Sequence, residues 1–328
     1  MKTVPGSLLG AALLAAAGAV SVARAQDKPA DYPRKPIRIV IGIAPAGGLD
    51  MMTRLGAQKL SERWGQSVIV DNRPGGGTVV AMDLVVKAPP DGYTLLGASD
   101  TLMLNGVLKR APYDVRSAFI PIVQLTTQPY VLIVTPSLPV KSVKDLIAYA
   151  KARPGALSFG SQGLGTTGHI GWERFKFMTG VDIVHVPYKG AAPAVIDVLS
   201  GQIEMTFSNT STSGMHLKSG KLRGLAITSP RRGQLFPDMP TVSESGVPGF
   251  ELSNSYGYYA PAGTSRDIVR AINSVVARAM NSPETVKSLA ADGSEAIPPS
   301  TPEAFKARFA KDYADLEKLI SAANIKFN

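Results

Sequence analysis

A short loop of small residues occurs twice in this sequence, each time between an apolar run and a helical pattern. The first loop, residues 44–50 (APAGGLD), follows the β-branched run 37–43, and the second, residues 160–169 (GSQGLGTTGH), follows the run 157–159. A strand, a flexible loop and a helix start direct free backbone N–H groups and the positive end of the helix dipole at one point. Two such loops, separated by 109 residues, predict two lobes that hold an anion between them.

The first 25 residues have the parts of a secretory signal peptide. Lys2 supplies the positive start, residues 8–22 are apolar, and residues 23–25 (ARA) match the small-residue cleavage pattern. The apolar run is shorter than the about 20 residues that span a bilayer. We expect cleavage before Gln26 and a periplasmic protein, with an uncleaved anchor or a core helix as the alternative.

Composition removes several classes of function. The chain has no cysteine, which excludes disulfides, a thiolate nucleophile and lipid attachment through cysteine. Loss of Lys2 and Arg24 with the leader lowers the formal net charge from +10 to +8, but no basic run exceeds two residues and none alternates with aromatic residues. We therefore expect no nucleic-acid partner and a modest preference for anionic solutes.

The mature chain alternates strand and helix patterns and is too long for one core. Apolar runs predict strands at 37–43, 68–70, 93–96, 130–134, 157–159, 183–186, 203–207, 222–228 and 253–260. Apolar periodicity, caps and breakers predict helices at 51–64, 78–87, 142–153, 167–178, 191–199, 265–281, 283–292 and 301–323.

This order predicts an α/β protein of two lobes, each built on a doubly wound sheet. Lobe 1 comprises residues 26–125 and 253–328, and lobe 2 comprises residues 126–252. Because the C-terminal segment returns to lobe 1, the chain crosses twice between the lobes. Paired crossings are typical of a hinge.

The second loop also matches the dinucleotide motif G-x-G-x-x-G, from Gly163 to Gly168. A dinucleotide site needs an acidic residue near the end of the next strand, and residues 185–189 (HVPYK) contain none. We therefore expect no cofactor, and interpret the glycines as letting the backbone approach a carboxylate.

Ser161 and His169 suggest a nucleophile with its base, but no acid is placed to orient the histidine and no G-x-S-x-G motif is present. The three histidines have no metal-ligand spacing, so we expect no metal site. Two interpretations of His169 stay open: a donor to an anion, or a half-buried side chain bonded to a carbonyl. His185, in the middle of a strand, is expected to be structural.

Hydroxyl and amide groups near the loops have two interpretations each. Ser161, Thr166 and Thr167 are expected to donate to a ligand, with helix capping as the alternative. Asp50 is expected to cap a helix rather than act as a general base. Ser208 and Asn209 follow a strand, where an α/β fold places its ligand cleft, and capping of the next helix is equally open for Asn209.

Segments along the mature chain resemble the Bug-type receptors, which are the substrate-binding proteins of tripartite tricarboxylate transporters. The resemblance is carried, in the family's order, by residues 36–50, 71–77, 90–96, 139–142, 159–161, 184–190, 225–229, 240–246 and 260–264.

The resemblance implies a periplasmic binding protein fold, type II-like, that closes on a small organic acid and delivers it to a membrane permease. It implies no catalytic residues and no cofactor, and we expect a monomer. The residues that it assigns to the ligand site are Ala46, Gly47, Gly48, Asp50, Ser161, Gly165, Thr166, Thr167, His169 and Asn209.

Three positions differ from the family pattern and bear on the ligand. Leu49 replaces a small or polar residue, Leu164 replaces a common Asn, and Ser208 replaces a common Asp. Loss of the acid disfavours an amino acid, whose ammonium group needs a carboxylate. The two leucines favour an apolar body. We therefore expect an aromatic carboxylate or dicarboxylate rather than citrate, with an NAD-dependent or hydrolytic α/β enzyme as the alternative function.

Overall fold

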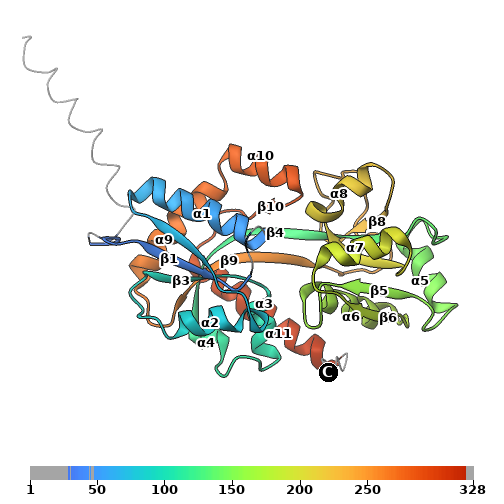
Figure 1. Ribbon diagram of the computed structural model, residues 1–328, viewed down its shortest axis with the longest axis horizontal. Helices are drawn as coiled ribbons and strands as arrows, with labels where there is room; N and C mark the ends of the chain where they lie inside the picture. The colour runs from blue at the N-terminus through green and yellow to red at the C-terminus, as the bar shows by residue number, and fades with distance from the viewer. Residues whose placement is uncertain (1–28, 30, 44, 46–47, 323–328) are drawn as a thin grey trace, which may run out of the picture.

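The computed structural model describes residues 29, 31–43, 45 and 48–322, so the expected signal peptide, Ala46 and Gly47 lie outside the described residues. The fold is α/β and has two lobes that lie side by side along the long axis (Figure 1). Figure 1 shows β4 and β9 running lengthwise through the middle of the molecule, with β5 and β6 at the far end from β1 and β3.

The sheet of lobe 1 begins with three parallel strands and continues with antiparallel ones. Its order is β2, β1, β3, β9, β4, and the short β10 pairs with β4. The strands are β1 (Ile37–Ile41), β2 (Val68–Asn72), β3 (Thr94–Ser99), β4 (Phe119–Val134), β9 (Ser253–Pro261) and β10 (Glu295–Ala296).

The sheet of lobe 2 has a parallel part, β6, β5 and β7, and its β7 pairs antiparallel with β4. β8 also pairs antiparallel with β4. These strands are β5 (Ser158–Ser161), β6 (Val184–Pro187), β7 (Met205–Asn209) and β8 (Arg223–Ile227).

One continuous strand joins the two sheets. The first part of β4, from Phe119 to Pro129, pairs with β9, and its last part, from Tyr130 to Val134, pairs with β7. The chain returns where β9 begins, at Ser253. The predicted strand covered only residues 130–134, so the first part of β4 and its antiparallel pairing with β9 are additions that the sequence did not predict.

Helices cover both faces of the sheets, with α1 and α10 above the strands and α2, α3 and α11 below them in Figure 1. Their bounds are α1 (Gly48–Trp64), α2 (Val79–Val86), α3 (Thr101–Val107), α4 (Val115–Ala118), α5 (Val143–Lys151), α6 (Thr167–Thr179), α7 (Ala191–Ser200), α8 (Thr210–Lys218), α9 (Arg266–Met280), α10 (Pro283–Asp292) and α11 (Pro302–Ala322), with a 3₁₀ turn at Gly76–Thr78. None of the helices in the described part of the chain combines the length and the hydropathy needed to cross a membrane.

Each lobe has a core of its own, which keeps its loops in fixed positions. Leu60 and Ile272 bring α1 and α9 onto the apolar face of the lobe 1 sheet. In lobe 2, the fully buried Trp172 of α6 stacks on Phe159 of β5 with ring centroids 5.0 Å apart and lies 4.3 Å from the ring of Phe207. This aromatic packing fixes the start of α6 relative to the ends of β5 and β7.

Candidate functional site

The first loop leads directly into α1, which begins at Gly48, earlier than predicted. Asp50 therefore lies inside the first helical turn and does not cap the helix. Its buried carboxylate accepts hydrogen bonds from Nε and Nη2 of Arg54, each at 2.9 Å, and from Nδ2 of Asn72, at 2.9 Å. A carboxylate in the first turn complements the helix dipole. Asp50 thus ties the start of α1 to the end of β2.

Leu49 and Gly48, which precede Asp50, have different surroundings. Leu49 is 3% exposed and packs into the core of lobe 1. Because its side chain is buried in this core, the expected contact between Leu49 and a ligand is not supported. Gly48 lies against the hinge, because a Cβ added to it would lie 2.7 Å from the hydroxyl of Tyr256 on β9. The end of the first loop therefore lies beside β9, where the chain returns to lobe 1.

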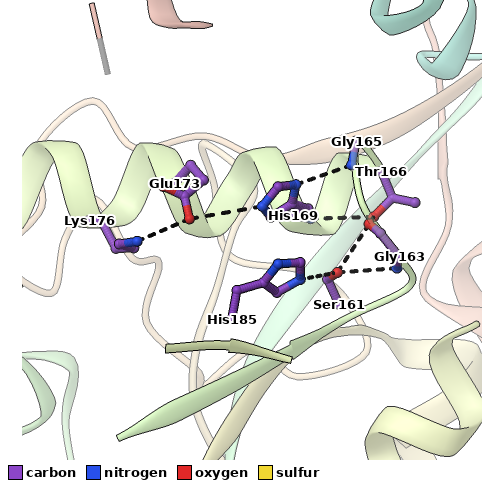
Figure 2. A network of polar contacts seen from close by, with 8 residues as sticks. All are labelled: Ser161, Gly163, Gly165, Thr166, His169, Glu173, Lys176 and His185. Carbon is purple, nitrogen blue, oxygen red and sulfur yellow. Dashed lines mark hydrogen bonds and ion pairs between the residues drawn. The ribbon is translucent and has the colours of Figure 1, made fainter. Parts of the chain in front are cut away.

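The second loop is held by a network of polar contacts around two histidines (Figure 2). His169 Nδ1 accepts the N–H of Gly165 at 3.1 Å, and the Oγ of Ser161 lies 2.7 Å from His185 Nε2. The Ser161 hydroxyl also donates to the carbonyl of Gly163 and accepts the Gly163 N–H, both at 3.1 Å. The N–H groups of Gly163 and Gly165 therefore serve the loop itself, and the expectation that Gly165 presents its N–H to a ligand is not supported.

Both histidines are neutral at physiological pH. Burial, together with the nearby Lys176 ammonium, lowers the pKa of His169 to about 4. Burial and the neighbouring imidazole likewise lower the pKa of His185 to about 4. The two rings stack with centroids 4.1 Å apart, so two positive charges would repel strongly. His169 Nδ1 is thus an acceptor for the loop backbone, and Nε2 faces Glu173 Oε1 at 3.9 Å.

This arrangement argues against a hydrolase. The partner of Ser161 is His185 and not His169, and Ser161 has no exposed surface. Its hydroxyl already bonds within the loop. A nucleophile must reach a substrate, and Ser161 does not.

Thr166 and Thr167 have different roles at the start of α6. Thr166 is the N-cap: its Oγ1 accepts the His169 N–H at 3.4 Å and donates to the Gly163 carbonyl at 2.8 Å, as the capping alternative predicted. Thr167 begins the helix. The N–H groups of Thr167 and Gly168 have no acceptor within the helix. Beside them, Leu164 is 42% exposed and is the apolar side chain of this loop that a ligand can reach.

A polar cluster on the hinge strands links the lobes. Gln128 Oε1 accepts from Nδ2 of Asn209 at 3.1 Å and from the Tyr256 hydroxyl at 3.4 Å, and Asn254 Nδ2 donates to that hydroxyl at 3.2 Å. Asn209 occupies the N-cap position of α8 without a side-chain capping bond. Ser208 is buried and donates to the Asn209 carbonyl at 3.3 Å. Asn209 thus belongs to the hinge, as does Gln128, which the sequence analysis missed.

Arg110, also missed, lies between loops of different lobes. A Cβ added to Gly165 would lie 2.8 Å from Nη2 and 3.0 Å from Nη1 of Arg110, and a Cβ added to Gly77 would lie 4.0 Å from Nη1. Gly77 belongs to the 3₁₀ turn after β2 in lobe 1, whereas Gly165 belongs to the second loop. No spacing in the sequence marks Arg110, because the contact depends on how the lobes meet.

A cavity of about 700 Å³ adjoins the site on the side of α6 and α11. Thr167 is the one predicted site residue in its lining, which otherwise includes Asp100, Arg174, Glu251, Arg308 and Asp312. Burial raises the pKa of Asp100 to about 7, although the Ser255 N–H donates to its carboxylate at 2.9 Å.

Two lobes on paired crossing strands, with a small-residue loop and a helix start on each lobe, define the class of two-lobed solute-binding proteins. Within the described ranges, no group of three or more His, Asp or Glu side chains is arranged to hold a metal ion.

Comparison with known proteins gives the family. The model of the tripartite tricarboxylate transporter family receptors matches residues 52–325, and the chain belongs to this family. It is 37% identical over 269 residues to the protein BugT of Bordetella pertussis, covering 81% of this chain and 82% of BugT.

Solved structures agree. Rpa4515 of R. palustris, solved with adipate, superposes with a TM-score of 0.80 at 37% identity, covering 90% of this chain and 99% of that one. MatC (Rpa3494) of Rhodopseudomonas palustris, solved with bound malate, has a TM-score of 0.76 at 25% identity, covering 88% of this chain and all of MatC. These likenesses bear out the two-lobed α/β fold and the resemblance to the Bug-type receptors.

Proposed function

We propose that the protein is an extracytoplasmic receptor that binds a small organic carboxylate between its lobes and delivers it to a tripartite tricarboxylate transporter permease. The observation that carries the proposal is the meeting of loops from both lobes, with Arg110 of lobe 1 against Gly165 of lobe 2. A ligand in such a place stabilises the closed form over the open one. The adipate and malate held by Rpa4515 and MatC are both carboxylates.

Within this proposal, the ligand meets the two helix starts. We assign the carboxylate to the N–H groups at the start of α6, near Thr167, and to the first loop at Gly48. Leu164 contacts the body of the ligand, which favours an aromatic dicarboxylate. We include Asn209 in the proposed site because it belongs to the polar cluster on the hinge strands. We include Ala46 and Gly47 in the proposed site on the basis of the family pattern alone.

The remaining parts of the proposal concern the whole protein. We propose lobe limits of 26–125 with 253–328 and of 126–252, a periplasmic location after cleavage before Gln26, a monomer, and no enzymatic activity. The intact mass of the exported protein tests the cleavage site. A mass that retains residues 1–25 would overturn the periplasmic assignment.

The receptor proposal is tested by thermal denaturation with a panel of carboxylates that includes adipate, malate and terephthalate. A ligand at a hundredfold excess over Kd stabilises by about 2.7 kcal/mol. For a chain of this size we expect the best acid to raise Tm by about 5 °C or more. Adipamide, which has the shape of adipate without its charge, is the control. Equal Tm values with all the acids and with adipamide would contradict the proposal.

The aromatic preference has a separate test in Leu164→Asn. Burial of a leucine side chain against the ligand contributes about 1.5–3 kcal/mol, so the variant should lose about tenfold or more in affinity for terephthalate. Affinity for malate should not fall. Ile196→Asn, at a 60% exposed position on α7, controls for the same kind of change outside the site. Unchanged preference between terephthalate and malate would remove the basis for the aromatic assignment.

A further inference from the structure

Arg110 brings a positive charge to the positive end of a helix. Its guanidinium packs against Gly165, the residue before the N-cap of α6, at distances of 2.8–3.2 Å from a Cβ placed on that glycine. Gly165 has φ +70°, so a side chain there would be strained as well as blocked. The second loop therefore leaves room for the guanidinium through a glycine that other residues replace poorly.

Nothing negative compensates this approach in the part of the chain that the structure describes. The guanidinium of Arg110 has no hydrogen bond or ion pair there, and it is exposed. Arg54 and Arg116, in the same lobe, each bind a carboxylate at 2.8–2.9 Å. A guanidinium and a helix N-terminus both favour an anion, and they repel each other without one. An anion between them would satisfy both.

The backbone around Arg110 is fixed before any ligand arrives. The Arg110 N–H donates to the backbone carbonyl of Asn105 at 2.9 Å. Asn105 Nδ2 donates to the Gly77 carbonyl at 2.8 Å and to Thr78 Oγ1 at 3.0 Å, which secures a turn in which Thr78 has φ 81°. The fully buried Asn105 thus holds Arg110 and the turn after β2 together.

Asn105 also offers an acceptor that the described residues leave unused. Its Oδ1 is buried without a hydrogen-bond donor, and it would lie 3.9 Å from a Cβ on Gly77. Buried acceptors are nearly always paired with a donor. A water or ligand hydroxyl entering beside Gly77 would supply the donor, and the same space borders Nη1 of Arg110.

We propose that Arg110 binds one carboxylate of the ligand against the start of α6, and that the ligand is a dicarboxylate whose other carboxylate lies at the start of α1. This proposal rests on the proposed receptor function and adds the residue that selects two carboxylates over one. Lobe 1 supplies the guanidinium and lobe 2 the helix start, so the bound carboxylate joins the lobes.

The test compares each dicarboxylate with its monocarboxylate counterpart by titration calorimetry: adipate with hexanoate, and terephthalate with benzoate. In the wild type, at least one dicarboxylate should bind tenfold or more tightly than its counterpart. Arg110→Gln should lower affinity for that dicarboxylate by tenfold or more and bring it near the affinity for the monocarboxylate. Arg110→Lys keeps the charge and loses the two-pronged geometry, so it should retain part of the selectivity. Lys109→Gln removes the same charge one residue away and should leave the selectivity unchanged.

The outcomes separate this inference from the receptor function. If Arg110→Gln, folded by circular dichroism, keeps the wild-type ratio between dicarboxylate and monocarboxylate, Arg110 does not select the second carboxylate. The same conclusion follows if the wild type prefers neither dicarboxylate, or if Lys109→Gln loses the selectivity equally. In these cases the receptor function stands. If none of the four acids binds the wild type, this inference is contradicted, and the receptor function is contradicted as well only if no acid of the thermal-denaturation panel raises Tm above that with adipamide.

Discussion

Acidification should destabilise the protein through His169. Its imidazole is 3% exposed, and burial lowers its pKa from 6.5 to about 4. Between these two pH values the unfolded chain binds a proton at this imidazole and the folded chain does not. Stability contributed by the neutral imidazole is therefore complete above pH 6.5 and declines as the pH falls towards about 4.

The size of the effect follows from the same pKa values. At about 1.36 kcal/mol per pKa unit, the lowered pKa of His169 corresponds to a loss of about 3 kcal/mol between pH 7 and pH 4. Protonation would also end the bond from Gly165 N–H to Nδ1 and place a charge 4.1 Å from the ring of His185. The second loop should therefore loosen in acid together with the loss of stability.

Urea denaturation of the wild type and of His169→Asn at pH 7, 5.5 and 4 measures this contribution. Asparagine can accept the Gly165 N–H but does not titrate. The variant should be less stable at pH 7, and its free energy of unfolding should fall by about 3 kcal/mol less than that of the wild type on going to pH 4. His216→Asn, on α8, controls for loss of a histidine elsewhere. Parallel pH dependence in the wild type and His169→Asn would show that the buried imidazole is not the source of the loss of stability in acid.

Burial raises the pKa of Asp100 to about 7, so the protonated form, which stabilises the fold, is lost as the pH rises through 7. Asp100→Asn keeps an acceptor for the Ser255 N–H and should raise the free energy of unfolding at pH 8 by up to about 4 kcal/mol. The same urea assay should show little gain for this variant at pH 4. Thr166→Val removes the N-cap of α6 and should cost about 1 kcal/mol of stability in urea, and a stability equal to wild type would deny the cap. Small-angle scattering should show a smaller radius of gyration with a bound dicarboxylate, and an unchanged radius at saturation would exclude lobe closure.

Local signals predicted the regular elements well where caps and breakers agreed with the apolar period. α5 begins after the N-cap Ser142, and α1 ends at Trp64, before Gly65 with φ +67°. The first part of β4 escaped prediction because Pro121 and Pro129 and several polar residues interrupt the run. Its partner, β9, is more than a hundred residues away in sequence, and the register shifts between Pro121 and Val123, next to the proline.

The sequence predicted the places of several candidate site residues in the fold. Ser161, Thr167 and Asn209 lie at the ends of parallel strands or the starts of helices, where the α/β fold places them. The sequence did not predict which loop groups are buried or already hydrogen-bonded: Leu49 faces the core, and the N–H of Gly165 donates to His169. The sequence also did not predict the contacts between the lobes. The position of Arg110 against Gly165 depends on the docking of two segments that share no sequence pattern.

The position of a bound dicarboxylate decides whether the ligand lies between the lobes. A crystal structure grown with the acid that raises Tm most should show that acid between the lobes, with one carboxylate between the Arg110 guanidinium and the start of α6 at Thr167. Its body should lie against Leu164, and the lobes should be closed on it. An acid located in the cavity between α6 and α11, or bound to one lobe alone, would contradict the proposed site.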